Sequence, residues 1–259
     1  LSLVNNLKGD LLRGLKLYEW RHHKNRKKPT TRSPRKNLTW DGKVSLKEKN
    51  FLVYEEQGLG DIIQFCRYFF LLEQNGASVT FKVKSNLHQL LKTLDTKVQF
   101  IEKFSEENKF DFEAPLLSLP YLFKTEVNSI PKFTSYLKAD AHRVEKWNEK
   151  IKSDKFKIGI CWQGKKSKVD IGRSFSLSLF EVISKIPNLE LISLYKGEDE
   201  NQLQNINFDV TSLGDDFDNN QDTFLDTAAV MNHCDLIITS DTSIAHLAGA
   251  LGHSVWVVL

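Results

Sequence analysis

The sequence has few cysteines, prolines and methionines, and it has no long apolar run. The three cysteines, Cys66, Cys161 and Cys234, lie far apart and form no CxxC pair. Neither a disulfide framework nor a cysteine zinc site is therefore indicated, and we expect a reducing compartment, the cytoplasm. No apolar run approaches the roughly 18 residues of a membrane-spanning helix, and no signal peptide opens the sequence. We expect no transmembrane segment.

The length of 259 residues leaves room for two hydrophobic cores of ordinary size. The first residue is Leu1, and the only methionine is Met231. The sequence ends inside the apolar run 255–259. We therefore expect the second domain to be incomplete at its C-terminal end.

The net charge of +3 conceals one strongly basic segment. Residues 21–36 hold eight lysines and arginines and no acidic residue. Such a run can contact the phosphates of nucleic acids or of lipid headgroups. Pro29 and Pro34 interrupt it, however, and no aromatic residue alternates with its charges. We favour a solvated linker over residues 23–46 and expect no nucleic-acid partner.

Residues 1–22 carry a helical pattern before this basic segment. Apolar residues recur there in steps of three and four, which places them on one stripe of a helix over residues 3–21. The stripe consists of Leu7, Leu11, Leu12, Leu15 and Tyr18. One such helix cannot bury its apolar face alone, so we expect residues 1–22 to be the end of an α-helical repeat array.

From residue 51 onward, short β-rich runs alternate with helical patterns, which is typical of parallel βαβ units. The strand candidates are 51–55, 79–83, 98–101, 111–114, 157–162, 189–194, 235–240 and 255–259. The helix candidates are 61–75, 86–94, 141–151, 179–186, 198–205, 223–233 and 243–251. The pattern predicts an α/β fold with two doubly wound domains, over 47–140 and 141–259. Such sheets bind ligands at the carboxyl ends of their strands, so we expect the site in a cleft between the domains.

The first strand runs into a glycine-rich turn that contains Gln57, Gly58, Gly60 and Asp61. The two glycines allow a sharp turn and let a ligand approach the amides at the start of the next helix. A purely structural turn is the alternative. A carboxylate at the first helical turn is either an N-terminal cap or a base that accepts a proton from an attacking hydroxyl. The residues alone leave both interpretations of Asp61 open.

A second candidate follows the predicted strand at 235–240, where polar residues open a helix. Thr242 and Ser243 offer hydroxyls and backbone amides at the positive end of that helix, which suits a diphosphate. Asp241 would repel a phosphate, so we expect it to cap the helix or to orient donors. His246 shares a helical face with Thr242 and Ser243. An ordinary polar histidine is the alternative.

Two further strand ends carry polar loops. Trp162 and Gly164 lead into a basic loop with Lys165, Lys166, Lys168 and Arg173, which can offset the charge of a leaving diphosphate. The alternative is a solvated loop. Lys196 and Glu198 flank a glycine before another helix, and Glu198 is otherwise a helix cap. No HExxH, GxSxG or P-loop motif is present, which disfavours zinc proteases, α/β-hydrolases and P-loop NTPases.

Four segments together resemble a known family. They read EQGLGD at 56–61, APLLSLP at 114–120, WQG at 162–164 and DTSIAHLAGALG at 241–252. In this order they resemble glycosyltransferase family 9, the heptosyltransferase-like domain found behind tetratricopeptide repeats in bacterial proteins. The resemblance covers residues 37–259, and the N-terminal helical segment looks like the end of such repeats.

The resemblance implies a GT-B fold, in which two Rossmann-like domains bind an acceptor and a nucleotide-sugar respectively. It implies an inverting, metal-independent sugar transfer that needs no cofactor. By this likeness Asp61 matches the general base. The segment that holds the nucleotide diphosphate in the family corresponds to Asp241, Thr242, Ser243 and His246. Ser243 stands where the family usually has glycine.

The resemblance also places the remaining candidates around the donor. Arg173 or a lysine of the loop 165–168 would lie near the diphosphate, and Lys196 and Glu198 near the base and ribose. The acceptor would be a glycan, a lipid or a protein, and the repeats would bind a protein partner. Two alternatives stay open: a non-catalytic GT-B-like binding module attached to the repeats, and an epimerase that hydrolyses a sugar nucleotide on the same fold.

Overall fold

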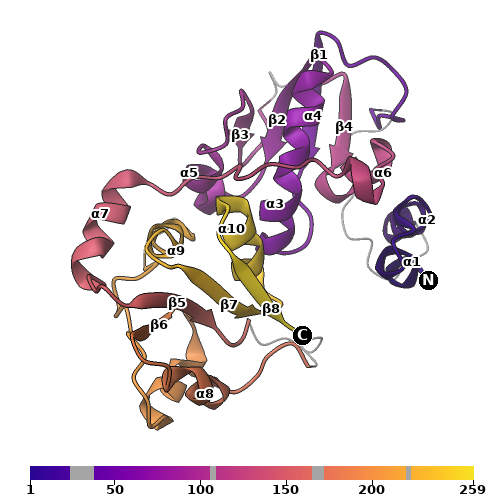
Figure 1. The fold of residues 1–259 in the computed structure, drawn as a ribbon. Helices are drawn as coiled ribbons and strands as arrows, with labels where there is room; N and C mark the ends of the chain where they lie inside the picture. Colours follow the sequence, from indigo (N-terminus) through magenta and orange to yellow (C-terminus); the bar gives the residue numbers. More distant parts are fainter. Residues whose placement is uncertain (24–37, 106–108, 165–171, 220–222) are drawn as a thin grey trace. The chain divides into compact units, whose positions relative to one another are not determined.

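The computed structural model spans all 259 residues and describes residues 1–23, 38–105, 109–164, 172–219 and 223–259, apart from the side chains of residues 198 and 199. The chain divides into two compact units (Figure 1). The first unit contains residues 1–85 and 95–133, and the second contains residues 86–94 and 134–259. The N-terminal helical segment therefore belongs to the same unit as the first sheet.

The first unit is built on a parallel sheet of four strands in the order β3-β2-β1-β4. The strands are β1 (Lys49–Tyr54), β2 (Ala77–Lys82), β3 (Gln99–Ile101) and β4 (Phe112–Pro115). The central strand β1 is buried from Phe51 to Tyr54. A continuous apolar run of this kind is typical of a parallel strand that is covered on both faces, which explains why the run was visible in the sequence.

A broken helix covers one face of this sheet (Figure 1). It consists of α3 (Leu59–Phe65), the 3-10 turn η2 (Cys66–Tyr68) and α4 (Phe69–Gln74), where the sequence predicted one helix over 61–75. Ile62, Phe69 and Leu72 are fully buried against the sheet, and each such side chain contributes about 1.5–3 kcal/mol by leaving water. The helix ends before Gly76, whose φ of 87° is the left-handed conformation that glycine adopts most easily.

Shorter helices follow the later strands of the first unit and complete it. These are η4 (Leu116–Ser118), α6 (Leu119–Leu122) and η5 (Val127–Ser129). After β2 come η3 (Ser85–Leu87) and α5 (His88–Leu91), where the sequence predicted one helix over 86–94; residues 86–94 belong to the second unit. These elements are too short to be stable alone, and tertiary packing of buried leucines holds η3, α5, η4 and α6 in place.

The N-terminal segment forms three short helices instead of one. They are α1 (Ser2–Leu7), α2 (Leu11–Tyr18) and the 3-10 turn η1 (Glu19–His22). Gly9 has a φ of 82°, and the Asp10 side chain accepts a hydrogen bond of 3.2 Å from the amide of Arg13, so a new helix begins there. The predicted single stripe is therefore divided: Leu7 is 88% exposed and Leu12 is 43% exposed.

The chain between residues 38 and 46, which the sequence assigned to a linker, packs against the first unit. Trp40 and Leu46 are buried there, and the ring of Trp40 contacts Phe51 edge-on at 5.6 Å. Thr39 forms a parallel bridge with Glu113 of β4. The rest of the basic segment, residues 24–37, lies outside the described residues.

The second unit repeats the parallel arrangement with four strands in the order β6-β5-β7-β8. The strands are β5 (Phe156–Cys161), β6 (Leu189–Ser193), β7 (Leu236–Ser240) and β8 (Val255–Val258). All eight strands of the two sheets lie within two residues of the predicted ones. The α/β class with two parallel sheets is therefore confirmed.

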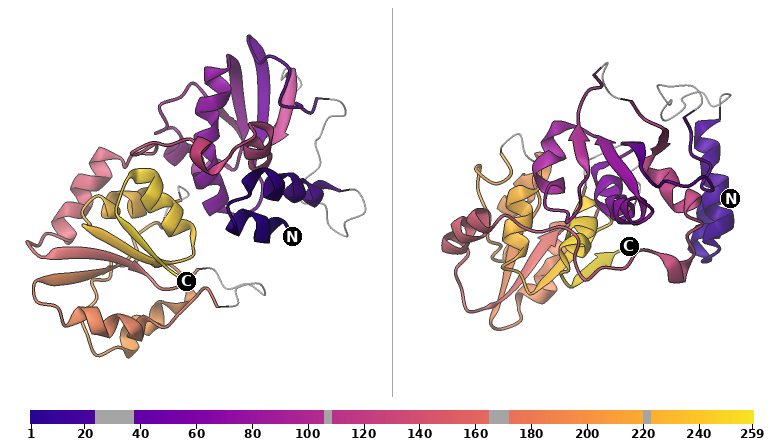
Figure 2. Two further views of the ribbon diagram at one scale, coloured as in Figure 1. Left: turned by 45° about the vertical axis from the view of Figure 1, so that its right-hand side comes forward. Right: turned by 90° about the horizontal axis from the view of Figure 1, so that it is seen from above.

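Helices cover both faces of the second sheet. They are α7 (Ala141–Lys150), η6 (Leu177–Phe180), α8 (Glu181–Ser184), η7 (Glu198–Asn205), α9 (Leu225–Met231) and α10 (Ser243–Leu251). Both views in Figure 2 place α9 and α10 on one face of the sheet and α8 on the other. The helix predicted over 198–205 is present with the same bounds as a 3-10 helix.

A buried polar network joins α7 to α9. The Asp226 carboxylate, 1% exposed, accepts hydrogen bonds from Arg143 at 2.8 Å and from the Trp147 indole at 2.9 Å. Its other oxygen accepts one from the amide of Asp218, whose own carboxylate accepts bonds from the Asp226 amide and the Thr227 hydroxyl. The charge of Asp226 is thus fully partnered, as a buried charge must be.

Candidate active site

The turn after β1 places a carboxylate at the start of α3. The Asp61 side chain accepts a hydrogen bond of 3.0 Å from the amide of Gly58, the residue that precedes the helix. Asp61 therefore does cap the helix, which was one of its two interpretations. A carboxylate has several lone pairs, so it can accept more than one donor at a time. Gly60 lies within the same first turn of α3.

Gln57 fixes the same turn from the other side. Its φ is 57°, a left-handed conformation that is uncommon for a residue with a side chain. Its amide nitrogen donates a hydrogen bond to the hydroxyl of Tyr18 in α2. Burial raises the pKa of Tyr18, so the phenol stays protonated at neutral pH. The N-terminal helices therefore touch the glycine-rich turn directly.

Arg21 and Glu56 form a buried ion pair beside this turn, and the sequence analysis did not predict it. The Arg21 side chain is 3% exposed, and its Nε and Nη2 atoms lie 3.2 and 2.8 Å from the two oxygens of Glu56. Burial alone would lower the pKa of Arg21, but the bonds and charges of Glu56 and Glu19 raise it. The sequence places Arg21 at the start of the basic segment 21–36. Composition alone does not show whether a guanidinium is buried or solvated.

In the second unit, β7 ends at Ser240 and α10 begins at Ser243, and the N-terminus of this helix is the candidate anion site. Thr242 is the N-cap of α10, and its hydroxyl accepts a hydrogen bond of 3.3 Å from the amide of Ile244. The cap is therefore Thr242, and not Asp241, which precedes it and is partly exposed. Ser243 is the first residue of the helix, and His246 lies on its first turns. A helix N-terminus of this length attracts anions through its amides and its dipole.

The loops after β5 and β7 meet at this corner. A Cβ atom placed on Gly164 would lie 3.1 Å from the methyl carbon of Thr242, so the two loops are in close contact. The strands β5 and β7 are parallel neighbours, which brings their carboxyl ends to one edge of the sheet. Two motifs that are far apart in the sequence are thus adjacent.

Trp162 supports this corner from inside the unit. Its indole is fully buried with Ile160 and Leu191, and its ring lies 4.9 Å from that of Tyr195. The Trp162 side chain has no exposed surface with which to contact a ligand. The sequence had predicted it among the nucleotide-binding residues. Gln163, which was not a candidate, donates a hydrogen bond of 2.8 Å to the Tyr195 hydroxyl. The loops after β5 and β6 are joined by this bond.

The structure describes some of the remaining residues that were predicted to bind the nucleotide-sugar. The Lys196 ammonium donates a hydrogen bond of 3.3 Å to the carbonyl of Asp215. Arg173 is exposed and follows Gly172, whose φ is 83°. Lys165, Lys166 and Lys168 lie outside the described residues, as does the side chain of Glu198.

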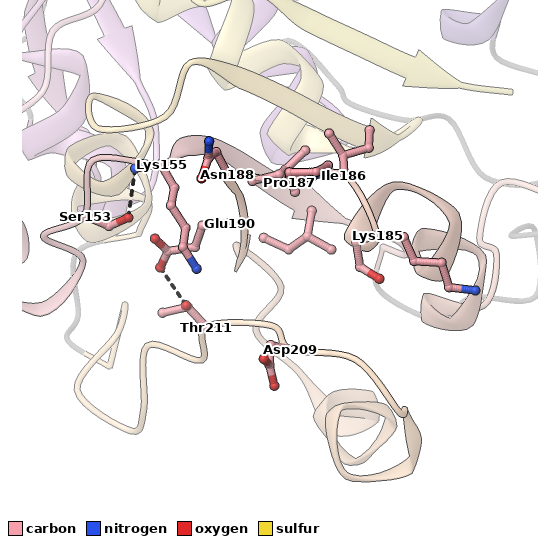
Figure 3. A pocket seen from close by; sticks show the side chains of 12 residues that line it. Ser153, Lys155, Lys185, Ile186, Pro187, Asn188, Glu190, Asp209 and Thr211 are labelled. Atoms are coloured by element: carbon pink, nitrogen blue, oxygen red, sulfur yellow. Dashed lines mark hydrogen bonds between the residues drawn. The ribbon is translucent and has the colours of Figure 1, made fainter.

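A polar hollow of about 570 Å³ lies at the other end of the second sheet (Figure 3). Lys155 and Asn188 border it immediately before β5 and β6. On its wall the Thr211 hydroxyl donates a hydrogen bond of 2.8 Å to Glu190. Ligands of parallel sheets bind at the carboxyl ends of the strands, so this hollow at their amino ends is not part of the candidate site.

Among the described residues there is neither a cluster that could hold a metal ion nor a helix that could span a membrane. Within the described ranges, no three histidine, cysteine, aspartate or glutamate residues gather closely enough to hold a metal ion. Measured over the same residues, every helix is too short or too polar to span a bilayer.

Comparison with known proteins identifies the fold. No family model matches the chain, and no curated protein matches it either. Among solved structures, a glycosyltransferase family 9 protein from Veillonella parvula aligns with a TM-score of 0.60 at 10% identity, covering 84% of this chain and 87% of its own.

Two E. coli enzymes align in the same way. ADP-heptose lipopolysaccharide heptosyltransferase II has a TM-score of 0.56 at 11% identity, over 80% of this chain and 84% of its own. Heptosyltransferase WaaC, solved with ADP, has a TM-score of 0.51 at 10% identity, over 80% of this chain and 86% of its own. The chain therefore has the two-domain α/β fold of these glycosyltransferases.

Proposed function

We propose that this protein transfers a sugar from a nucleotide-diphosphate donor to an acceptor hydroxyl. The fold it shares with glycosyltransferases supports the proposal, but fold alone does not define an activity. The observation that carries it is the placement of Asp61. The sequence predicted a carboxylate at the carboxyl end of the first strand, and Asp61 lies there with its orientation fixed by the Gly58 amide.

In the proposed reaction, Asp61 accepts the proton of the acceptor hydroxyl as its oxygen attacks the anomeric carbon. The oxygen forms a bond to that carbon, and the bond to the nucleoside diphosphate breaks with inversion. The nucleoside diphosphate leaves with the bonding electrons, and we propose that Thr242, Ser243 and His246 at the start of α10 bind it. Arg173 and the lysines of the preceding loop would offset its negative charge. Because these groups can carry the leaving-group charge, we propose a transfer without a metal ion or cofactor.

The substrate classes follow from the chemistry of this reaction. An adenine nucleotide linked to a heptose is the first donor to test, since the E. coli enzymes are named with ADP-heptose or were solved with ADP. Lys196 and Glu198 are the proposed neighbours of the base and ribose. The acceptor class is a glycan, lipid or protein hydroxyl. We further propose a cytoplasmic protein whose N-terminal helices belong to a repeat that binds a protein partner.

The test is calorimetry and a thermal-shift screen with ADP, ADP-heptose and other nucleotide-sugars. At a ligand concentration of 100 times Kd, binding stabilises the protein by about 2.7 kcal/mol, which corresponds to a shift of roughly 5–10 °C. Transfer is then measured as release of ADP when acceptors are added, with and without EDTA. Loss of transfer in EDTA would contradict the metal-independent step.

The alternatives predict different results in the same experiment. A binding module without catalytic activity, for which Ser243 in place of glycine is the motivation, would release no nucleoside diphosphate with any acceptor. A hydrolysing epimerase would release it without an acceptor. Transfer that needs both donor and acceptor supports the proposed function over both.

A further inference from the structure

The guanidinium of Arg21 joins three segments that are distant in the sequence. Besides the two bonds to Glu56, its Nη2 donates to the Ser118 hydroxyl at 2.8 Å, and its Nη1 lies 2.6 Å from Glu19. Its central carbon lies 4.4 Å from the centre of the Tyr18 ring. Arg21 thus connects the N-terminal 3-10 turn η1 with the chain after β1 and with η4 after β4.

These contacts lie at the edge of the sheet where the candidate base is found. The strands β1 and β4 are parallel neighbours, so Glu56 and Ser118 follow strand ends at the same edge. Glu56 is 3% exposed, and Ser118 is 2% exposed. A planar guanidinium with several donors is the one side chain that can hold a carboxylate at two points and still reach a hydroxyl.

Three consecutive residues of the turn are held in place next to this cluster. Glu56 is bound by Arg21, Gln57 donates to the hydroxyl of Tyr18, and the Gly58 amide donates to Asp61. The first two of these bonds have their partners, Arg21 and Tyr18, in the N-terminal helices, and in the third bond Asp61 is the acceptor. The left-handed φ of 57° at Gln57 has a conformational cost, so the turn needs such outside support.

We propose that Arg21 is a positioning residue for Asp61. This inference rests on the proposed function, and it makes the N-terminal helical segment part of the acceptor half of the enzyme. Arg21 holds Glu56 at the start of the turn, and Tyr18 holds Gln57. The turn is thereby kept in the conformation that presents the Asp61 carboxylate to the acceptor hydroxyl.

The test compares Arg21→Lys with a matched control, Arg143→Lys. The lysine keeps the charge but has no planar fork, so it cannot bind both oxygens of Glu56. Arg143 pairs with the buried carboxylate of Asp226 in the second unit, although its own side chain is 24% exposed. Hydrogen exchange of the whole protein, read by mass spectrometry over residues 55–61, reports on the turn without any need for activity.

We expect Arg21→Lys to raise exchange in residues 55–61 by about tenfold or more, and Arg143→Lys to leave it unchanged. We expect kcat of Arg21→Lys to fall by a similar factor while the Kd for the donor stays constant. Adding Glu56→Gln to Arg21→Lys should lower kcat by less than the product of the single effects, because both changes remove one interaction.

Unchanged exchange in the turn of Arg21→Lys would overturn the proposal, as would an unchanged kcat per folded molecule. So would a rise in exchange of the turn in Arg143→Lys as large as that in Arg21→Lys. Failure of the proposed function would look different, because the wild-type protein itself would then neither bind nor turn over a donor. The exchange measurement still decides whether Arg21 holds the turn in that case.

Discussion

Gly164 and Thr242 are in such close contact that a Cβ atom on Gly164 would lie only 3.1 Å from the Thr242 methyl carbon. The contact sets the spacing between the loops after β5 and β7, at the edge where we propose that the diphosphate binds. A larger residue at position 164 must push the Thr242 side chain away from its capping position. The N-terminus of α10 would then lose its hydroxyl cap.

We predict that Gly164→Val weakens ADP binding by about tenfold or more, since a displaced cap and loop cost at least about 1.4 kcal/mol. Calorimetry with ADP measures the change. Gly249→Ala is the matched control, because an added Cβ there meets nothing within 4 Å. Alanine within a helix should stabilise the protein by up to about 1 kcal/mol and leave binding unchanged. Equal affinity of Gly164→Val and wild type would place the nucleotide elsewhere.

The Asp226 network predicts the local stability of the second unit. Asp226→Ala leaves the buried Trp147 indole without its acceptor and the partly exposed Arg143 without its carboxylate, so we expect it to destabilise α7 and α9 by about 1–3 kcal/mol. Hydrogen exchange of peptides from these helices measures the loss. Asp216→Ala is the control, because the Asp216 side chain is 75% exposed and lies 3.9 Å from Lys150. That change should stay within about 0.5 kcal/mol of wild type.

The same network has a defined pH dependence. Burial alone would raise the pKa of Asp226, but hydrogen bonds from Trp147 and Arg143 lower it. Its contribution to stability is therefore present above its unfolded pKa of about 3.9 and is lost as pH falls through the folded value. Burial raises the pKa of Asp218, so its contribution has the opposite sign and is lost as pH rises through its folded value. The loss caused by Asp226→Ala should hence be smaller at pH 3 than at pH 7.

The sequence predicted the sheets well because their signal is local. Parallel strands buried on both faces contain apolar runs that are visible in the sequence, such as 51–54 in β1 and 236–238 in β7. The ends of these strands also located Asp61 and Thr242. The role of each residue there is less apparent from the sequence. Thr242, and not Asp241, caps α10, and this depends on the backbone geometry of the turn.

The ion pair of Arg21 and Glu56 was not predictable in the same way. Its partners are 35 positions apart, and Arg21 opens a run of basic residues whose composition indicates a solvated segment. The structure reveals the pair through the burial of both side chains, 3% and 0% exposed. The division of the N-terminal helix at Gly9 does have a local signal in the sequence, a glycine followed by the capping residue Asp10. The prediction of one helix followed the apolar stripe instead of this signal.

The buried cysteines give a chemical test of the packing. Burial raises the pKa of the Cys66 thiol to about 12 and that of Cys161 to about 11. At pH 8 only about one Cys161 in a thousand is then a thiolate. We predict that iodoacetamide modifies both residues at least about 100-fold more slowly in the native protein than in denaturant, followed by mass spectrometry of peptides. Rapid native labelling of Cys161 would contradict the packing of the strand end at Gly164.

Asp61 allows its two roles to be separated by substitution. Asn at this position keeps an oxygen that can accept the Gly58 amide but cannot act as a base at neutral pH, whereas Ala loses both functions. We predict that Asp61→Asn lowers kcat by about 10²-fold or more with an unchanged Kd for the donor.

Asp61→Ala should lose the same activity and, in addition, about 0.5–2 kcal/mol of stability through the missing cap. The stability difference between the two variants therefore measures the cap, and the activity difference between wild type and Asp61→Asn measures the base. If Asp61→Asn turned over at the wild-type rate, the hydrogen bond to Gly58 would be the whole function of Asp61. The proton acceptor would then have to be sought among other groups near the end of β1.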